Sequence, residues 1–109
     1  MKNLVYIIVT ASFPVQKGIE VAKKFVEERK KNPPDRTLIK QILDALRVVR
    51  GRVKSISISK VKEGKLDEAL IRTQNDMVAY HELEGYKYTI EVLFDVVEAL
   101  EMVGIKPPE

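Results

Sequence analysis

Residues 52–62, RVKSISISKVK, form the segment that decides the fold, because apolar and hydroxyl side chains alternate along it. The apolar positions share one parity and the hydroxyl positions share the other: Ile56 and Ile58 against Ser55, Ser57 and Ser59. Successive side chains of a strand point to opposite faces of a sheet, so this alternation predicts a β-strand. We expect its isoleucines to pack against helices and its serines to face away from them.

The chain has the length and composition of one small globular domain. It has 109 residues, of which 45% are hydrophobic and 32% are charged, and these fractions are ordinary for a folded domain. We therefore expect one α/β domain over residues 1–109, in which 106–109 form a tail. The longest apolar run, Leu4 to Val9, is too short to cross a bilayer. The prediction is a cytoplasmic protein with no membrane segment.

Cysteine is absent from the chain, and there is one histidine. This composition excludes disulfides, thiolate metal ligands and cysteine nucleophiles, and it argues against a histidine-based zinc site. We expect no metal and no cofactor. The thirteen lysines and eleven glutamates resemble the amino-acid usage of thermophile proteins.

Positive and negative charges are separated along the chain. Residues 1–60 carry 14 Lys and Arg against 5 Asp and Glu, whereas residues 61–109 carry 5 against 11. One interpretation is a basic surface for nucleic acid. The other, which we favour, is that one part of the chain docks against the other, within or between subunits.

The remaining elements follow from apolar periodicity and from turn residues. Further strands are predicted at residues 3–12 and 86–93, and helices at 15–31, 35–49, 65–83 and 96–103. In the second helix, Asp35 is the expected N-cap and Gly51 the expected residue after the C-terminus. Asp95 and Gly104 are expected to cap the last helix.

The third predicted helix has two apolar stripes. One is the core face, which includes Leu66, Leu70 and Met77. The other consists of Ile71 and Val78, and one sheet should not need both stripes. We expect Ile71 and Val78 to contact a second subunit, and the protein to be a homodimer.

The predicted order of elements is β-α-α-β-α-β-α, which indicates the α+β class. Two β-α units of similar make favour a ferredoxin-like or split βαβ layer, with a three-stranded core sheet and helices on one face. The second face of that sheet is then free for a ligand or a partner.

Residues 60–104 resemble the half-units of the dimeric α/β-barrel group. The resemblance lies in the order of EGKLDEAL (63–70), EGYKYTIEVL (84–93) and DVVEALEMVG (95–104). It implies that two subunits pair their open sheet faces into a barrel, but it implies no particular chemistry, because members of the group differ in function. The chain departs from the group's pattern in the predicted helix 35–49 and in the lack of a clear fourth strand.

No P-loop, GxGxxG, HExxH, GxSxG or calcium-loop motif occurs in the sequence. We therefore favour a small dimeric module that binds a protein or a small ligand. One alternative is a cofactor-free enzyme with Glu91 and His81 as acid/base candidates, and with a pocket on the open sheet face. The ligand-binding side chains expected on that face are Tyr6, Thr10, Ser55, Ser57, Ser59 and Thr89.

The weaker alternative is nucleic-acid binding through a basic corner next to the 52–62 strand. Such a corner could contact phosphates, but it has no interleaved aromatic residues on which bases could stack. Its members are Arg47, Arg50, Arg52 and Lys54.

Overall fold

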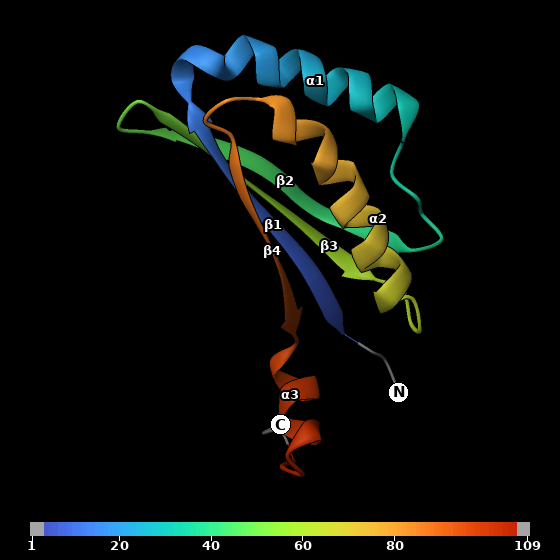
Figure 1. Ribbon diagram of the computed structural model, residues 1–109. Helices are drawn as coiled ribbons and strands as arrows, with labels where there is room; N and C mark the ends of the chain where they lie inside the picture. The colour runs from blue at the N-terminus through green and yellow to red at the C-terminus, as the bar shows by residue number, and fades with distance from the viewer. Residues whose placement is uncertain (1–3, 107–109) are drawn as a thin grey trace.

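The structure, a computed structural model, describes residues 4–106 (Figure 1). Its strands are β1 (Val5–Pro14), β2 (Ile39–Val49), β3 (Arg52–Val61) and β4 (Lys87–Phe94). Its helices are α1 (Gly18–Lys31), α2 (Leu66–Val78) and α3 (Val96–Met102). Short 3₁₀ helices precede α1 and follow α2, at η1 (Val15–Lys17) and η2 (Ala79–Glu82). The α+β class expected from the sequence is confirmed.

The four strands form one antiparallel sheet in the order β2-β3-β1-β4. Helices α1 and α2 both lie over one face of this sheet, which we call the helix side (Figure 1). No helix within residues 4–106 covers the opposite face, which we call the bare face. The prediction of a three-stranded sheet is wrong, because β2 supplies a fourth strand.

Residues 35–49, predicted as a helix, contain strand β2 instead. Arg50 and Gly51 have positive φ angles of 50° and 76°, and this is the backbone of a two-residue type I′ hairpin turn. The turn folds β2 back onto β3, so that the two strands pair along their length. Gly51 therefore serves a hairpin and does not end a helix.

A β-bulge explains why the sequence of β2 resembles that of a helix. Gln41 lies opposite Ser59 and Leu43 lies opposite Ile58, so Ile42 is an extra residue in the ladder. The bulge shifts the alternation by one position, and apolar residues then recur three and four apart, as they do in a helix.

Asp35, the expected cap of that helix, forms a local turn. Its side chain accepts a hydrogen bond from the backbone N–H of Thr37 at 2.9 Å. Such a turn is compatible with the start of a strand.

The core lies between the sheet and the two helices in two clusters. The cluster beneath α2 consists of Val5, Ile7, Leu38, Val61 and Ala69. The cluster near the start of α1 consists of Phe13, Val21 and Val53. Leu66 and Leu70 of α2 pack against the first cluster, as their predicted core stripe requires.

The direction of the β3 side chains is the reverse of the prediction. Val53 and Val61 have the same parity as the three serines, and both are buried on the helix side. The serines therefore face the helices, whereas Ile56 and Ile58 face away. The physical reason is that Lys54 and Lys60 share the isoleucine face, and burying them beneath helices would desolvate two cations.

Gly85 is placed where a side chain cannot fit. Its φ is +82°, and a Cβ atom there would lie 3.0 Å from Cδ of Pro14. We expect Gly85→Ala to lower the free energy of unfolding by about 2–3 kcal/mol in urea denaturation, through backbone strain and this clash.

Gly64→Ala is the matched control, because Gly64 also has a positive φ (+75°) but has no neighbour within 4 Å of an added Cβ. It should cost about 1 kcal/mol from backbone strain alone. Equal losses in the two variants would contradict a contact between Gly85 and Pro14.

Candidate functional site

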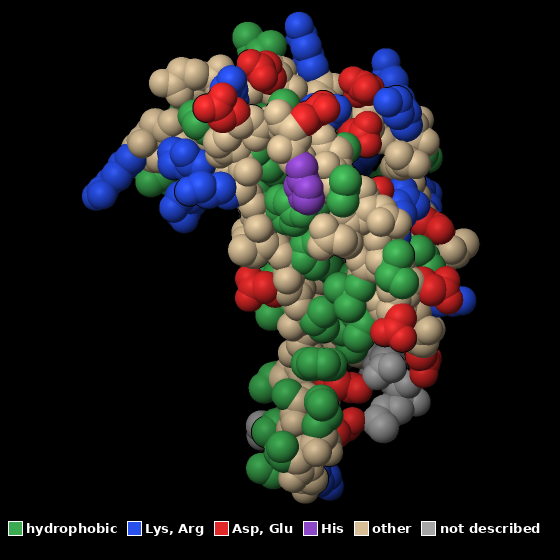
Figure 2. All heavy atoms as spheres, viewed as in Figure 1, with side chains coloured by type: hydrophobic (Ala, Val, Ile, Leu, Met, Phe, Trp, Pro, Cys, Tyr) green, Lys and Arg blue, Asp and Glu red, His purple; other side chains and the backbone are tan. Residues whose placement is uncertain are grey.

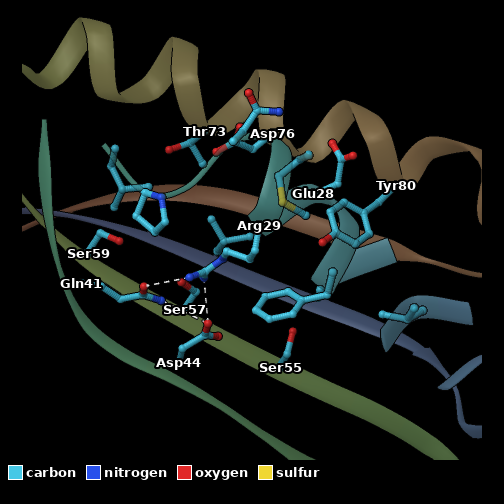
Figure 3. A pocket seen from close by; sticks show the side chains of 18 of the residues that line it. Glu28, Arg29, Gln41, Asp44, Ser55, Ser57, Ser59, Thr73, Asp76 and Tyr80 are labelled. Atoms are coloured by element: carbon cyan, nitrogen blue, oxygen red, sulfur yellow. Dashed lines mark hydrogen bonds and ion pairs between the residues drawn. The ribbon is translucent and has the colours of Figure 1, made fainter. Parts of the chain in front are cut away.

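A cleft of about 770 Å³ lies between the helix side of the sheet and helices α1 and α2 (Figure 3). Its floor combines apolar side chains of β1 with hydroxyl groups of β3: Ile7, Val9, Ala11, Ser55, Ser57 and Ser59. The serine side chains are too short to fill the space beneath the helices. The cleft therefore exists because β3 presents its small residues to the helices.

Aromatic rings form one end of the cleft. The ring centroids of Tyr80 and Tyr86 are 4.9 Å apart, and those of Phe13 and Tyr86 are 5.7 Å apart. Burial raises the pKa of the Tyr80 and Tyr86 phenols, and the neighbouring Tyr80, Tyr88 and Asp44 raise that of Tyr86 further. Both phenols are therefore neutral at physiological pH and can act as hydrogen-bond donors.

Arg29 bridges the cleft from α1 to β2, as the dashed lines in Figure 3 show. It donates hydrogen bonds from Nη2 to Oδ2 of Asp44 at 3.0 Å and from Nη1 to Oε1 of Gln41 at 3.4 Å. Gln41 in turn donates from Nε2 to Oδ2 of Asp44 at 3.1 Å. The Arg29 guanidinium also lies over the Phe25 ring, 4.8 Å from its centroid.

This bridge can open at low cost. The Arg29 and Asp44 side chains are 38% and 37% exposed, and ion pairs with that exposure contribute about 0–1 kcal/mol to stability. Entry of a ligand between α1 and β2 is therefore compatible with a folded protein.

Arg72 closes the connection between α1 and β2. Its Nε donates to both carboxylate oxygens of Asp76, at 3.0 and 3.2 Å. Its Nη2 donates to the backbone carbonyls of Asn32 and Pro33, at 3.0 and 2.8 Å. The loop that follows α1 is thus held against α2, and this keeps α1 and α2 side by side over the sheet.

The side chains predicted to share one pocket lie on both faces of the sheet. Tyr6, Thr10, Thr89 and Glu91 are on the bare face, where the Oγ1 atoms of Thr10 and Thr89 are 2.5 Å apart. Ser55, Ser57 and Ser59 are on the helix side, in the cleft. The prediction that these two groups meet is wrong, because the facing of β3 was inverted.

The two acid/base candidates are also separated. Nε2 of His81 lies 2.5 Å from the Tyr88 hydroxyl, and the two rings stack with centroids 5.5 Å apart. Gln74 donates to the same hydroxyl at 3.0 Å. Tyr88 lies opposite Ala11 on the helix side, whereas Glu91 lies opposite Ile8 on the bare face. His81 and Glu91 therefore do not form a common site.

The basic corner lies at the end of the β2–β3 hairpin, where Lys and Arg side chains gather in Figure 2. Its members are Arg47, Arg50, Arg52 and Lys54. Arg52 is held in the fold, because it donates to Oγ of Ser12 at 2.8 Å and to the Gly85 carbonyl at 3.2 Å. Nucleic-acid binding at this corner stays a prediction.

The second stripe of α2 is exposed, as predicted. Ile71 and Val78 have 62% and 49% of their surface accessible. A subunit contact at these two residues stays a prediction.

The polar bridge of the cleft, Arg29, Gln41 and Asp44, was not predicted from the sequence. Arg29 lies in the predicted helix 15–31, where no role was expected for it, and Gln41 and Asp44 lie in the segment 35–49 that was predicted as a helix. The signal that could have found them is Arg50-Gly51 between two apolar runs, since a glycine-containing pair at such a position favours a two-residue hairpin.

Among residues 4–106, no group of three or more His, Cys, Asp or Glu is arranged to hold a metal ion. The helices in this range are also too short or too polar to cross a membrane. No family model matches the chain, and no curated protein is significantly similar to it.

Proposed function

We propose that the protein is a binding module for a small, uncharged, amphipathic molecule that lies in the cleft between α1, α2 and the sheet. The observation that carries this proposal is the cleft itself. Its volume of about 770 Å³ is within the range of about 300–1,000 Å³ that is usual for small-molecule sites.

The lining of the cleft indicates the chemistry of the ligand. Phe13, Tyr80 and Tyr86 offer ring faces and edges against which a planar or aliphatic ring can pack. Ser55, Ser57 and Ser59 offer a row of hydroxyls about 7 Å apart along β3. The charges of Arg29 and Asp44 neutralise each other, so a ring compound with hydroxyl or carbonyl groups fits better than an ion.

The order of strands and the placement of both long helices on one face support a ferredoxin-like, split βαβ layer. Strand β2 fills the position for which the sequence offered no clear fourth strand. The bare face supports the homodimer that the resemblance to dimeric α/β barrels implies. An enzyme pocket on the bare face has less support, because the serines do not face it.

Binding to the cleft can be tested with the fluorescent dye N-phenyl-1-naphthylamine, an uncharged aromatic probe. The chain has no tryptophan, so the dye emission is not obscured by indole fluorescence. We expect saturable binding that Ser57→Phe weakens by about tenfold or more, equivalent to about 1.4 kcal/mol, because the added ring occupies the floor of the cleft.

Thr89→Phe is the matched control, since it adds the same ring to a strand on the bare face. It should leave dye binding in the cleft unchanged, and circular dichroism should show that both variants are folded. Ser55→Phe gives a second test if Ser57→Phe does not fold. Loss of binding in Thr89→Phe alone would place the dye on the bare face and overturn the proposal.

A further inference from the structure

Helix α3 is capped at its N-terminus by Asp95 but makes few packing contacts with the other helices and strands within residues 4–106. It projects beyond the end of the sheet, away from α1 and α2 (Figure 1), and hydrophobic side chains gather over it (Figure 2). Val96, Met102 and Val103 are 68%, 67% and 69% exposed. A helix of seven residues is not stable in water by itself, because helices shorter than about 12–15 residues need tertiary contacts.

Within the same chain, the bare face offers an apolar centre. The strand register places Leu43, Ile58, Ile8 and Glu91 in one row across this face. The next row consists of Ala45, Ile56, Thr10 and Thr89. Burial of these two rows against a partner surface would be favourable.

The rows on either side of this centre carry cations. Lys40 lies directly opposite Lys60, and Arg47 lies directly opposite Lys54. Like charges at such positions destabilise a sheet. In the part of the chain that the structure describes, none of these four side chains forms an ion pair with a carboxylate.

The segment that contains α3 has the opposite charge. Residues 88–105 include four carboxylates and no lysine or arginine. Two of the carboxylates, Glu98 and Glu101, belong to α3, and neither forms an ion pair with any residue between 4 and 106. The chain thus contains an acidic, apolar helix and a basic, largely apolar sheet face, and neither is covered by another element among residues 4–106.

We propose that α3 of one copy packs against the Lys40 and Lys60 end of the bare face of a second copy. These lysines lie in the row of Tyr6 and Leu93, at the end of the sheet where α3 begins. Strands β2 and β4 are the two edges of the sheet. A two-fold axis parallel to the strands places β4 of one copy opposite β2 of the other, and it keeps the α3 ends of the two sheets on the same side. Each α3 follows β4, so it reaches the β2 edge of its partner.

The symmetry forms this contact twice, and the apolar centres of the two bare faces then cover each other. The inference rests on the proposed homodimer and names the elements that build it. It does not depend on which molecule the cleft binds.

Charge reversal in two separate variants tests the contact. The variant E98K/E101K has a basic α3 and a basic face, and K40E/K60E has an acidic α3 and an acidic face. We expect each variant alone to dimerise at least about tenfold more weakly than the wild type in sedimentation velocity. An equimolar mixture should form a heterodimer, because both α3 contacts then join opposite charges.

K23E/K30E is the matched control, since it reverses two exposed lysines of α1, away from the bare face. It should dimerise like the wild type. A monomeric wild type would overturn both the homodimer and the role of α3. Docking of α3 on its own chain would give this result, with the wild type and all variants monomeric. A dimeric wild type whose variants dimerise equally well would overturn the role of α3 alone.

Nucleic acid is the other occupant that the lysines could attract. If K40E/K60E dimerises normally but loses a salt-dependent affinity for generic RNA, the cations serve nucleic acid and the proposal is wrong. Dye binding in the cleft is measured independently, so its failure cannot be confused with either outcome.

Discussion

Ile7→Ala is expected to lower the free energy of unfolding by about 4 kcal/mol, which is a large part of the stability of a domain of this size. Ile7 is 2% exposed, and it lies on β1 at the centre of the cluster that α2 covers. Removal of its branched side chain loses the transfer free energy of three carbons and leaves a cavity. Ala69 of α2, which is 1% exposed, has a side chain too small to fill that cavity.

Urea denaturation followed by circular dichroism measures this loss. Ile19→Ala is the matched control, because Ile19 undergoes the same truncation on α1 but is 73% exposed. Its effect should stay within about 0.5 kcal/mol. A similar loss in the two variants would show that α2 does not pack over β1 as described.

Stability is expected to fall steeply above pH 10, and Tyr86 is expected to cause much of the fall. Burial, and then the neighbouring Tyr80, Tyr88 and Asp44, raise the pKa of the Tyr86 phenol from its ordinary value of 10.0. Above pH 10 the unfolded chain therefore loses this proton while the folded chain retains it. The unfolded state is favoured, and each such tyrosine contributes a slope of about 1.4 kcal/mol per pH unit.

The comparison of wild type with Tyr86→Phe isolates this contribution. At pH 7 the Tyr86 phenol is neutral in both the folded and the unfolded wild type. The phenyl ring of the variant keeps the stacking contacts with Phe13 and Tyr80, so the two proteins should have similar stability. Between pH 10 and pH 12 the stability of the variant should fall less steeply. Parallel curves over this range would contradict the burial of Tyr86.

Local signals in the sequence were sufficient for several elements. Asp95 was predicted to cap α3, and its carboxylate accepts a hydrogen bond from the backbone N–H of Val97 at 3.0 Å. Gly104 was predicted to end the helix, and it has a φ of +76° with its N–H bonded to the Glu101 carbonyl. Both predictions succeeded because a cap depends on residues within one turn of helix.

Strand β2 shows where local signals fail. Its apolar residues recur with the spacing of a helix, and an isolated peptide of this sequence has no reason to be extended. Its pairing with β3 and the bulge at Ile42 decide its conformation, since a ladder of backbone hydrogen bonds outweighs the modest helix propensity of single residues.

That β3 is a strand, and which of its residues share a face, follows from its local pattern, because the period of two is a property of the backbone. Which of the two faces the helices cover depends on long-range packing. That choice depends on the ends of the strand. Val53 and Val61 can be buried there, whereas the ammonium groups of Lys54 and Lys60 must stay hydrated. It turned the serines inward and opened the cleft, and it left the isoleucines on a bare face that α3 of a second copy is proposed to help cover.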